Sequence, residues 1–115
     1  WLGDLNVAPE DIDVYNPAGL KGSVCFNEQI TQVLYDTMDW GLIDVFRSHN
    51  KDAGQYTFWD YRMRGGLKRN TGWRLDHILA TKPLAEKCTR CYVDKIPRAM
   101  PQPSDHTPLI AEFKI

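Results

Sequence analysis

The segment from Arg74 to Thr81 constrains the fold of this chain most strongly, because it is apolar on both faces and still contains a carboxylate. A strand of this composition belongs in a sheet that is covered on both sides. Asp76 lies within it, where an unpaired charge would be costly. The sequence therefore predicts a partner for Asp76. A histidine is one candidate, and Arg74 or Arg47 is the alternative.

Two further polar motifs adjoin apolar residues, one near each end of the chain. The first is Gly3-Asp4-Leu5-Asn6 and the second is Ser104-Asp105-His106. Acid, amide and imidazole side chains are costly to bury without a purpose. We therefore expect the three motifs to converge on one catalytic cleft. Taken alone, Asp4 and Asn6 would also suit a polar turn after a strand, and Asp105 would suit a turn or a helix N-cap.

The rest of the chain divides into segments of recognisable pattern. Residues 7–26 are rich in Asp, Pro, Gly and Asn without a period, which predicts a long surface loop. From Asn27 to Gly41 the apolar residues follow the spacing of an amphipathic helix, with Asn27 as its N-cap. The other expected elements are a short helical element over 42–46, a strand over 55–60, a hairpin or long turn over 62–72, a helical turn at Pro83, and strands over 88–96 and 108–113.

Composition sets broad limits on the class of protein. The 115 residues correspond to one small domain, and a net charge of −1 argues against a protein that coats nucleic acid everywhere, while leaving room for a local basic strip. No apolar run approaches the roughly 20 residues that cross a bilayer, and no basic-then-apolar leader is present. The odd number of cysteines favours a reducing compartment, so a cytoplasmic location is expected. Cys88 and Cys91 are too few for a zinc site, and we expect them to be structural thiols.

Five motifs together resemble one known family. They lie at residues 3–6 (GDLN), 40–47 (WGLIDVFR), 56–62 (YTFWDYR), 72–76 (GWRLD) and 103–108 (PSDHTP). With these motifs the chain resembles the C-terminal half of the exonuclease III family of apurinic/apyrimidinic (AP) endonucleases, within the endonuclease/exonuclease/phosphatase superfamily. The two aromatic motifs indicate the DNA-repair branch.

The resemblance implies an α/β fold. Family members form a four-layer α/β sandwich (DNase I-like), and residues 1–115 would be its C-terminal portion, with one mixed sheet and helices on its outer face. The N-terminal half of the same domain would be absent and would act as a partner. That half carries a metal-binding Glu, an Asn and a Tyr in the family, so we expect this chain alone to be inactive.

The resemblance also implies roles for individual residues. Asp4, Asn6, Asp76 and His106 would be catalytic. Asp4 would activate the attacking water, Asn6 would bind a phosphoryl oxygen, and Asp76 would orient His106. The metal-associated residues would be Asp4, Asn6, Asp105 and His106, with Mg²⁺ as the cofactor and Mn²⁺ as a possible substitute.

By the same resemblance, DNA would be contacted by the segment 58–75, through Phe58, Arg62, Trp73, Arg74 and Leu75. The implied function is magnesium-dependent hydrolysis of the DNA backbone 5′ to abasic sites, with 3′-exonuclease activity, on double-stranded DNA carrying abasic or 3′-blocked sites. Two alternatives remain open at this point. One is a phosphatase of the same superfamily acting on small phosphoesters or lipids, and the other is a non-catalytic nucleic-acid-binding fragment.

Several residues are expected to be structural. Strand alternation sends His77 to the face opposite Asp76, so we predict a structural role for it. His49 has no partner in the sequence and receives no role. Trp59 and Tyr61 are predicted to be aromatic core residues, in contrast to Phe58 and Trp73, which are expected to line a pocket.

Overall fold

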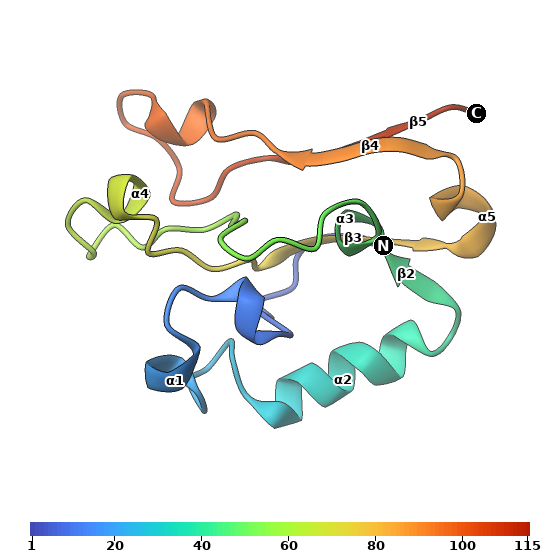
Figure 1. The fold of residues 1–115 in the computed structure, drawn as a ribbon, viewed down its shortest axis with the longest axis horizontal. Helices are drawn as coiled ribbons and strands as arrows, with labels where there is room; N and C mark the ends of the chain where they lie inside the picture. The colour runs from blue at the N-terminus through green and yellow to red at the C-terminus, as the bar shows by residue number, and fades with distance from the viewer.

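A computed structural model describes all residues from Trp1 to Ile115. Helices and short strands are interspersed along the chain, and the predicted α/β class is confirmed (Figure 1). The strands are β1 (Leu2–Asp4), β2 (Leu42–Asp44), β3 (Asp76–Thr81), β4 (Cys88–Val93) and β5 (Leu109–Phe113). The helices are η1 (Asp11–Asp13), α1 (Pro17–Leu20), α2 (Glu28–Met38), α3 (Val45–His49), α4 (Gly66–Arg69), α5 (Lys82–Ala85) and η2 (Pro97–Ala99).

The strand predicted from Arg74 to Thr81 is β3, and it occupies the middle of a three-stranded sheet. β1 and β2 pair antiparallel with its two edges, so they run parallel to each other with β3 inserted between them. The chain passes from β1 to β2 through α2, which lies along one side of the sheet (Figure 1). The register of β1 against β3 places Asp4 opposite Asp76.

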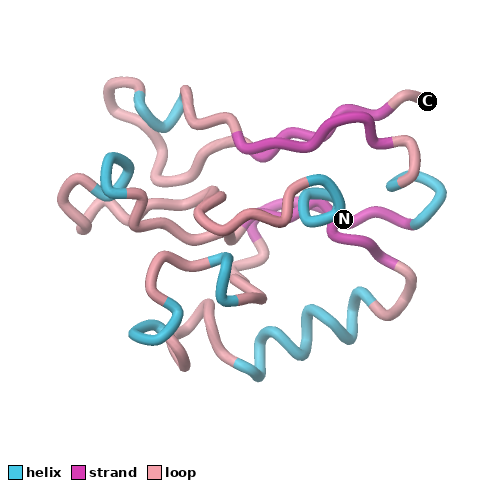
Figure 2. Tube along the Cα trace, in the orientation of Figure 1, coloured by secondary structure: helices cyan, strands magenta, loops and turns pink.

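A second sheet consists of β4 and β5 alone, paired antiparallel. The expectation of one mixed sheet is therefore wrong in its detail, because every ladder is antiparallel and the two sheets share no hydrogen-bonded strand pair. The sheets are joined by side-chain packing instead. Val45 and Phe46 of α3 form a buried cluster with Ala80 of β3 and Cys91 of β4. In Figure 2 the two sheets lie side by side, and α2 lies on the side of the three-stranded sheet that faces away from β4 and β5.

The predicted amphipathic helix is confirmed as α2. Its first turn is capped by Asn27, whose side-chain oxygen accepts a hydrogen bond from the backbone N–H of Ile30 at 3.0 Å. Gly41 follows the helix with φ of +108°, a conformation that favours glycine over residues with a Cβ atom. The buried residue of the helix is Leu34, which packs against Val7 and Leu79.

Residues 42–46 do not form the single helical element that was predicted. The first three join the edge of β3 as β2, and α3 begins only at Val45. Asp44 marks the boundary, because its carboxylate accepts a hydrogen bond from the backbone N–H of Arg47 and caps α3. Three ladder pairs with β3 thus decide the conformation of a segment whose composition also suits a helix.

The segment 7–26 is not the surface loop that was predicted. Ala8, Val14 and Phe26 are buried with Leu75 in one hydrophobic cluster, and the η1 and α1 turns lie within the segment. Asp13 is fully buried as well. The apolar residues are spaced irregularly because they pack inward from turns. Their burial is therefore not indicated by a helical or strand periodicity in the sequence.

The predicted strand over 55–60 is also wrong. Phe58 makes only isolated β-bridges, one to Trp73 and one to His106. The predicted turn over 62–72 is present, and it contains the short helix α4. Downstream the predictions hold: Pro83 lies in α5, and the two last strands are β4 and β5.

The predicted core aromatics differ from each other. Trp59 is fully buried, as expected, but Tyr61 is 60% exposed and the prediction for it is wrong.

All three cysteines are free thiols, and burial raises the pKa of Cys91 to about 12. The longest helix has 11 residues, and none has both the length and the apolar character that crossing a membrane requires.

Candidate active site

A buried ion network fixes the chain that leads into β3. The guanidinium of Arg74 is 1% exposed, and its Nε donates to Asp13 Oδ1 at 2.6 Å while its second terminal nitrogen lies 2.9 Å from Asp44 Oδ2. Arg47 also pairs with Asp13. Burial opposes ionisation of Asp13, but the two guanidinium groups outweigh it and hold its pKa below the usual range.

This network corrects the role expected for Arg74. The sequence resemblance assigned Arg74 to DNA contact, yet its side chain is enclosed by protein and saturated by carboxylates. It cannot reach a phosphate without giving up its buried pairs with Asp13 and Asp44. Arg74 is therefore a structural residue beneath the candidate site.

His77 belongs to the same interior. Its Nε2 lies 2.6 Å from the carbonyl oxygen of Val7, and its Nδ1 lies 3.2 Å from a terminal nitrogen of Arg74. Burial, together with the charge of Arg74, lowers the pKa of His77 below its usual value. The ring points away from Asp76, as strand alternation predicted.

Thr57 connects the segments that carry the candidate catalytic residues. Its hydroxyl oxygen accepts hydrogen bonds from the backbone N–H groups of Leu75 and Asp76, at 3.0 and 3.1 Å. Its carbonyl oxygen accepts from the N–H of Thr107 at 2.8 Å. Thr57 is fully buried, so these are contacts that water cannot replace. One residue thus holds the start of β3 against the loop that follows His106.

The partner of Asp76 is His106, and neither Arg74 nor Arg47 contacts it. Nδ1 of His106 lies 2.8 Å from Oδ2 of Asp76. Its other ring nitrogen, Nε2, lies 3.6 Å from Oδ2 of Asp4. By accepting Nδ1–H, the Asp76 carboxylate fixes the orientation of the ring, and Nε2 then lies on the side of Asp4.

The position of the imidazole follows from the register of the sheet. Asp4 and Asp76 are cross-strand partners, and like charges directly opposite each other repel. His106 lies between them, with Nδ1 in a hydrogen bond to Asp76 and Nε2 at 3.6 Å from Asp4, which is longer than a hydrogen bond. The geometry makes an acid–imidazole–acid arrangement at one end of the central sheet.

Asn6 completes the first motif. Its backbone N–H donates to Oδ1 of Asp4 at 3.0 Å, which fixes the Asp4 side chain. Asn6 itself has φ of +53°, in the left-handed region that Asn tolerates better than most residues. Both residues are exposed, in contrast to the buried network below them.

A pocket of about 320 Å³ opens beside this arrangement. It brings together Asn6 and His106 with Phe58 and Trp73, which were expected to line a pocket, and with Leu75, which was expected to contact DNA. The Phe58 ring lies 5.1 Å from the His106 ring, between centroids. Arg62 also lines the pocket, where it donates to the Asp60 carboxylate and holds the pKa of that acid below its usual range.

Asp105 does not join the group. Its carbonyl oxygen accepts from the N–H of Trp59 at 2.9 Å, but its carboxylate makes no hydrogen bond or ion pair with Asp4, Asn6 or His106. The turn at this point is set instead by Ser104, whose hydroxyl accepts from the N–H of His106.

The expected metal set of Asp4, Asn6, Asp105 and His106 is therefore not assembled by this chain. No three His, Cys, Asp or Glu side chains lie close enough to hold an ion together. Asp4 and Asn6 offer oxygen donors of the kind that Mg²⁺ binds, but they are too few for a site. The residues present do not suffice for the ion on their own.

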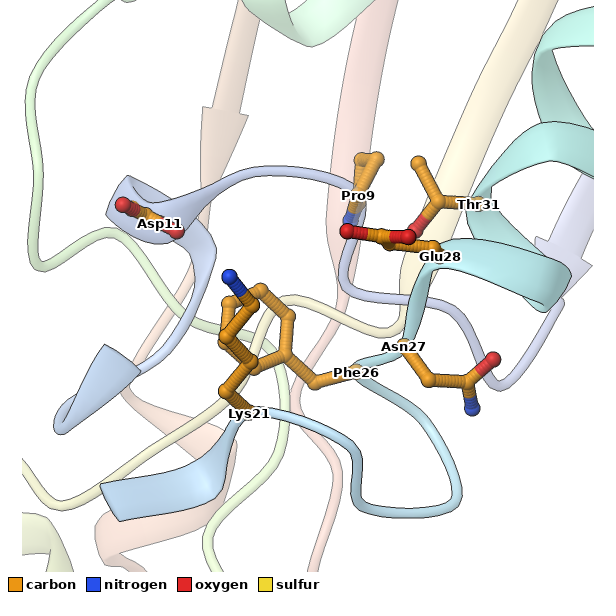
Figure 3. A pocket seen from close by; sticks show the side chains of 7 residues that line it. All are labelled: Pro9, Asp11, Lys21, Phe26, Asn27, Glu28 and Thr31. Atoms are coloured by element: carbon orange, nitrogen blue, oxygen red, sulfur yellow. The ribbon is translucent and has the colours of Figure 1, made fainter. Parts of the chain in front are cut away.

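A second hollow, of about 210 Å³, lies between η1 and the start of α2 (Figure 3). Its lining includes Asp11, Lys21 and Glu28, and it shares no residue with the pocket beside His106. The charges there are of both signs. It takes no part in the candidate site.

Two residues that build the site, Asp13 and Thr57, were not predicted from the sequence. Nothing in the polar segment around Asp13 distinguishes it from the neighbouring acids. However, an arginine within the apolar run that forms β3 requires a buried acidic partner, and this requirement could have indicated an acid elsewhere in the chain. Thr57 could have been noticed as a small hydroxyl residue between Tyr56 and Phe58, but its partners lie 18 or more residues away.

Comparison with known proteins agrees with this arrangement. The sequence profile described as "Endonuclease/Exonuclease/phosphatase family" matches residues 1–106. Exodeoxyribonuclease III of Haemophilus influenzae is 37% identical over 120 residues, which cover 98% of this chain and 45% of the relative. The DNA-(apurinic or apyrimidinic site) endonuclease of Dictyostelium discoideum is 36% identical, with 95% of this chain and 29% of the relative covered.

Solved structures give the same result. An AP endonuclease from Archaeoglobus fulgidus superposes with a TM-score of 0.96 at 49% identity, over 100% of this chain and 45% of that one. The 3′ phosphatase NExo from Neisseria, bound to a product DNA hairpin, has a TM-score of 0.93 at 36% identity, over 99% and 44% of the two chains. The chain thus spans less than half the length of these relatives. It belongs to the endonuclease/exonuclease/phosphatase family.

Proposed function

We propose that this chain is part of a DNA-repair phosphodiesterase of the exodeoxyribonuclease III and AP endonuclease type, which hydrolyses the DNA backbone 5′ to abasic sites. The observation that carries the proposal is the position of His106, held between Asp76 and Asp4 at the mouth of the pocket beside Phe58 and Trp73. The names of the relatives support the same class of substrate.

Phosphodiester hydrolysis places negative charge on the phosphoryl oxygens while water attacks the phosphorus atom. In its protonated form, His106 can donate a hydrogen bond from Nε2 to such an oxygen while Nδ1 donates to Asp76. The side-chain amide of Asn6 provides a second donor at the same pocket. Asp4 is exposed and can orient or deprotonate the attacking water. Cleavage on this side of the lesion leaves a 3′-hydroxyl.

The pocket beside His106 supports the proposed preference for abasic sites. Phe58, Trp73 and Leu75 make it apolar on one side, and an extruded sugar without a base would fit there more readily than a whole nucleotide. An abasic nucleotide also loses little stacking when it leaves the duplex. The basic residue available at this pocket is Arg62, since Arg74 is buried.

Two features of the proposal extend beyond the residues present. The relatives are more than twice as long as the aligned region, and this chain supplies too few ligands for Mg²⁺ or Mn²⁺. We propose that the remaining metal ligands and catalytic groups come from a further segment, the N-terminal half of the same domain, so that these 115 residues alone are inactive. The cytoplasmic location expected from the free thiols stays a prediction.

The proposal is tested by cleavage of an end-labelled duplex with one abasic site, in the presence of Mg²⁺. A protein that carries this chain together with the segment found in its relatives should cut 5′ to the lesion, and the 115 residues alone should not. Trp73→Ala should reduce the preference for the abasic duplex over the intact duplex. Trp40→Ala is the matched control, because Trp40 is exposed and lies outside the pocket.

The outcomes separate this function from its rivals. Equal binding of abasic and intact duplexes, with rapid hydrolysis of small phosphoesters, would favour a phosphatase of the same family. Robust cleavage by residues 1–115 alone would show that no further segment is needed.

A further inference from the structure

The backbone of Trp73, which forms one wall of the pocket beside His106, is held on both sides. On one side, Phe58 and Trp73 exchange backbone hydrogen bonds at 2.9 and 3.0 Å. On the other side, the backbone N–H of Tyr15 donates to the carbonyl oxygen of Gly72 at 3.1 Å. A Cβ atom at Gly72 would lie within 2.7 Å of two aromatic side chains, so the chain is packed closely here. The wall of the pocket therefore rests on a fixed backbone.

A fixed backbone still leaves the indole of Trp73 free to rotate unless another group holds the ring, and Tyr15 is placed to do so. The two rings meet edge to face, with their centroids 6.4 Å apart and their planes at 74°. This is one of the preferred arrangements of aromatic pairs. Both side chains are half-buried, but only Trp73 lines the pocket. Tyr15 thus contacts the wall without facing the space where a ligand would bind.

The hydroxyl group of Tyr15 makes a second contact, to Met63. It donates to the sulfur atom of Met63 at 3.5 Å, and sulfur is a weak acceptor. The backbone N–H of Met63 in turn donates to the carbonyl oxygen of Asp60 at 3.0 Å, and both Asp60 and Arg62 line the pocket. One tyrosine side chain therefore joins two separate parts of the pocket lining, the indole of Trp73 and the turn that carries Arg62.

We propose that Tyr15 is a positioning residue, which holds the Trp73 indole in the orientation that makes the pocket selective for an abasic sugar. The width of the pocket depends on where its aromatic rings lie, so rotation of the indole would change which groups fit. Tyr15 touches neither the substrate nor the reacting atoms and acts through Trp73. This inference rests on the proposed function, and it assigns part of the selectivity to a residue outside the pocket.

The first test measures the Trp73 ring in this chain without DNA. After Trp1→Phe and Trp40→Phe, the remaining indoles are Trp59, which is fully buried, and Trp73, which is half-buried. Quenching of tryptophan fluorescence by acrylamide then reports mainly on Trp73. Tyr15→Leu should raise the quenching constant by about 2-fold or more, because the edge-to-face contact no longer restricts the ring. Tyr15→Phe keeps that contact and should change the constant much less.

The second test measures selectivity in the longer protein proposed above. Tyr15→Leu should raise KM for the abasic duplex by about 3- to 10-fold with kcat nearly unchanged, because an aromatic pair supports a binding surface here and no reacting group. Affinity for the intact duplex should stay the same, and Tyr15→Phe should recover most of the loss. In a Trp73→Ala background, Tyr15→Leu should have no further effect, since the ring that it holds is gone. Tyr35→Leu is the control in both tests, because Tyr35 lies on α2 outside the pocket.

The outcomes separate the inference from the proposed function. An unchanged quenching constant in Tyr15→Leu would overturn the inference, and so would an equal loss of affinity for the abasic and intact duplexes. A full additional effect of Tyr15→Leu in the Trp73→Ala background would also overturn it, because Tyr15 would then act independently of the indole. These three results leave the proposed function intact. Absence of any abasic preference in the unaltered longer protein would instead overturn the proposed function, and the quenching measurement would still decide whether Tyr15 holds the ring.

Discussion

Nδ1 of His106 lies 2.8 Å from Oδ2 of Asp76, although 30 residues of sequence separate them. Asp76 begins the central strand, whereas His106 lies in a loop that precedes β5. The contact therefore forms only when the two sheets are in place, and it links the integrity of the candidate site to the packing between them.

Replacing Asp76 by Asn keeps the size of the side chain but removes the charge that orients the His106 ring. We expect Asp76→Asn to reduce kcat on the abasic duplex by roughly 100-fold or more in the longer protein proposed above, because general acid–base groups contribute about 10²- to 10⁴-fold. Thermal unfolding should change little, as the side chain is partly exposed. Asp39→Asn, on the surface after α2, is the control. A loss of thermal stability that matches the loss of rate would contradict the orienting role.

Asp13 is the shared acid of the buried network, and its loss leaves Arg74 with one partner fewer in the interior. We expect Asp13→Asn to lower the free energy of unfolding by about 3–5 kcal/mol, as is typical when one member of a buried pair is removed. Chemical denaturation monitored by tryptophan fluorescence would measure it. Asp36→Asn, on the exposed face of α2, should cost far less, and similar losses for the two variants would contradict a buried network.

The stability of the protein should also depend on the charge state of His77. Burial and the charge of Arg74 lower its pKa below the ordinary value of 6.5. The unfolded chain therefore binds the proton more readily, so the stability from neutral His77 is complete above pH 6.5 and is lost as pH falls through the folded pKa.

The measurement is the free energy of unfolding between pH 7.5 and pH 5, from denaturant titrations of the wild-type chain and His77→Gln. The variant should show a shallower loss toward low pH, since Gln does not titrate and can still donate to the Val7 carbonyl. Parallel curves for the two proteins would show that other groups control this range. The corresponding loss from Asp13, whose ordinary pKa is 3.8 and is lowered in the fold, occurs only below that pH.

Thr57→Val removes the acceptor that serves the backbone N–H groups of Leu75 and Asp76. Each buried donor left without a partner costs about 1–3 kcal/mol, so we expect a loss of at least that size in the free energy of unfolding. Thr57→Ser retains the hydroxyl and should recover most of the loss. Faster hydrogen exchange at the two amides in the Val variant alone would locate the effect, and equal stability of the Val and Ser variants would contradict it.

Local signals in the sequence were sufficient for α2 and β3. Asn27 caps a helix of regular apolar spacing, and the run ending at Thr81 is too apolar for any position except a sheet interior. The cost of an unpaired acid in that run predicted a partner for Asp76 but left a histidine and an arginine open, and the choice of His106 came from the family resemblance.

Other features depend on contacts that no local pattern records. Phe58 extends between Trp73 and His106 through isolated bridges, so its segment resembles a strand in composition without entering a sheet. Arg74 and Asp13 are 61 residues apart, and only the folded chain reveals that the arginine points inward. The expected metal set of Asp4, Asn6, Asp105 and His106 is not assembled in the fold, since the Asp105 carboxylate pairs with none of the other three.

The register of β1 against β3 has a further consequence for how this sequence can vary. Leu2, Gly3 and Asp4 face Ile78, His77 and Asp76 in turn. Deleting or inserting a single residue within either strand would turn the side chain of one acid to the opposite surface and away from the imidazole. Related sequences should therefore accept substitutions at Leu2, which is 71% exposed, more readily than insertions or deletions in either strand. The position of each acid within its strand should keep a constant register.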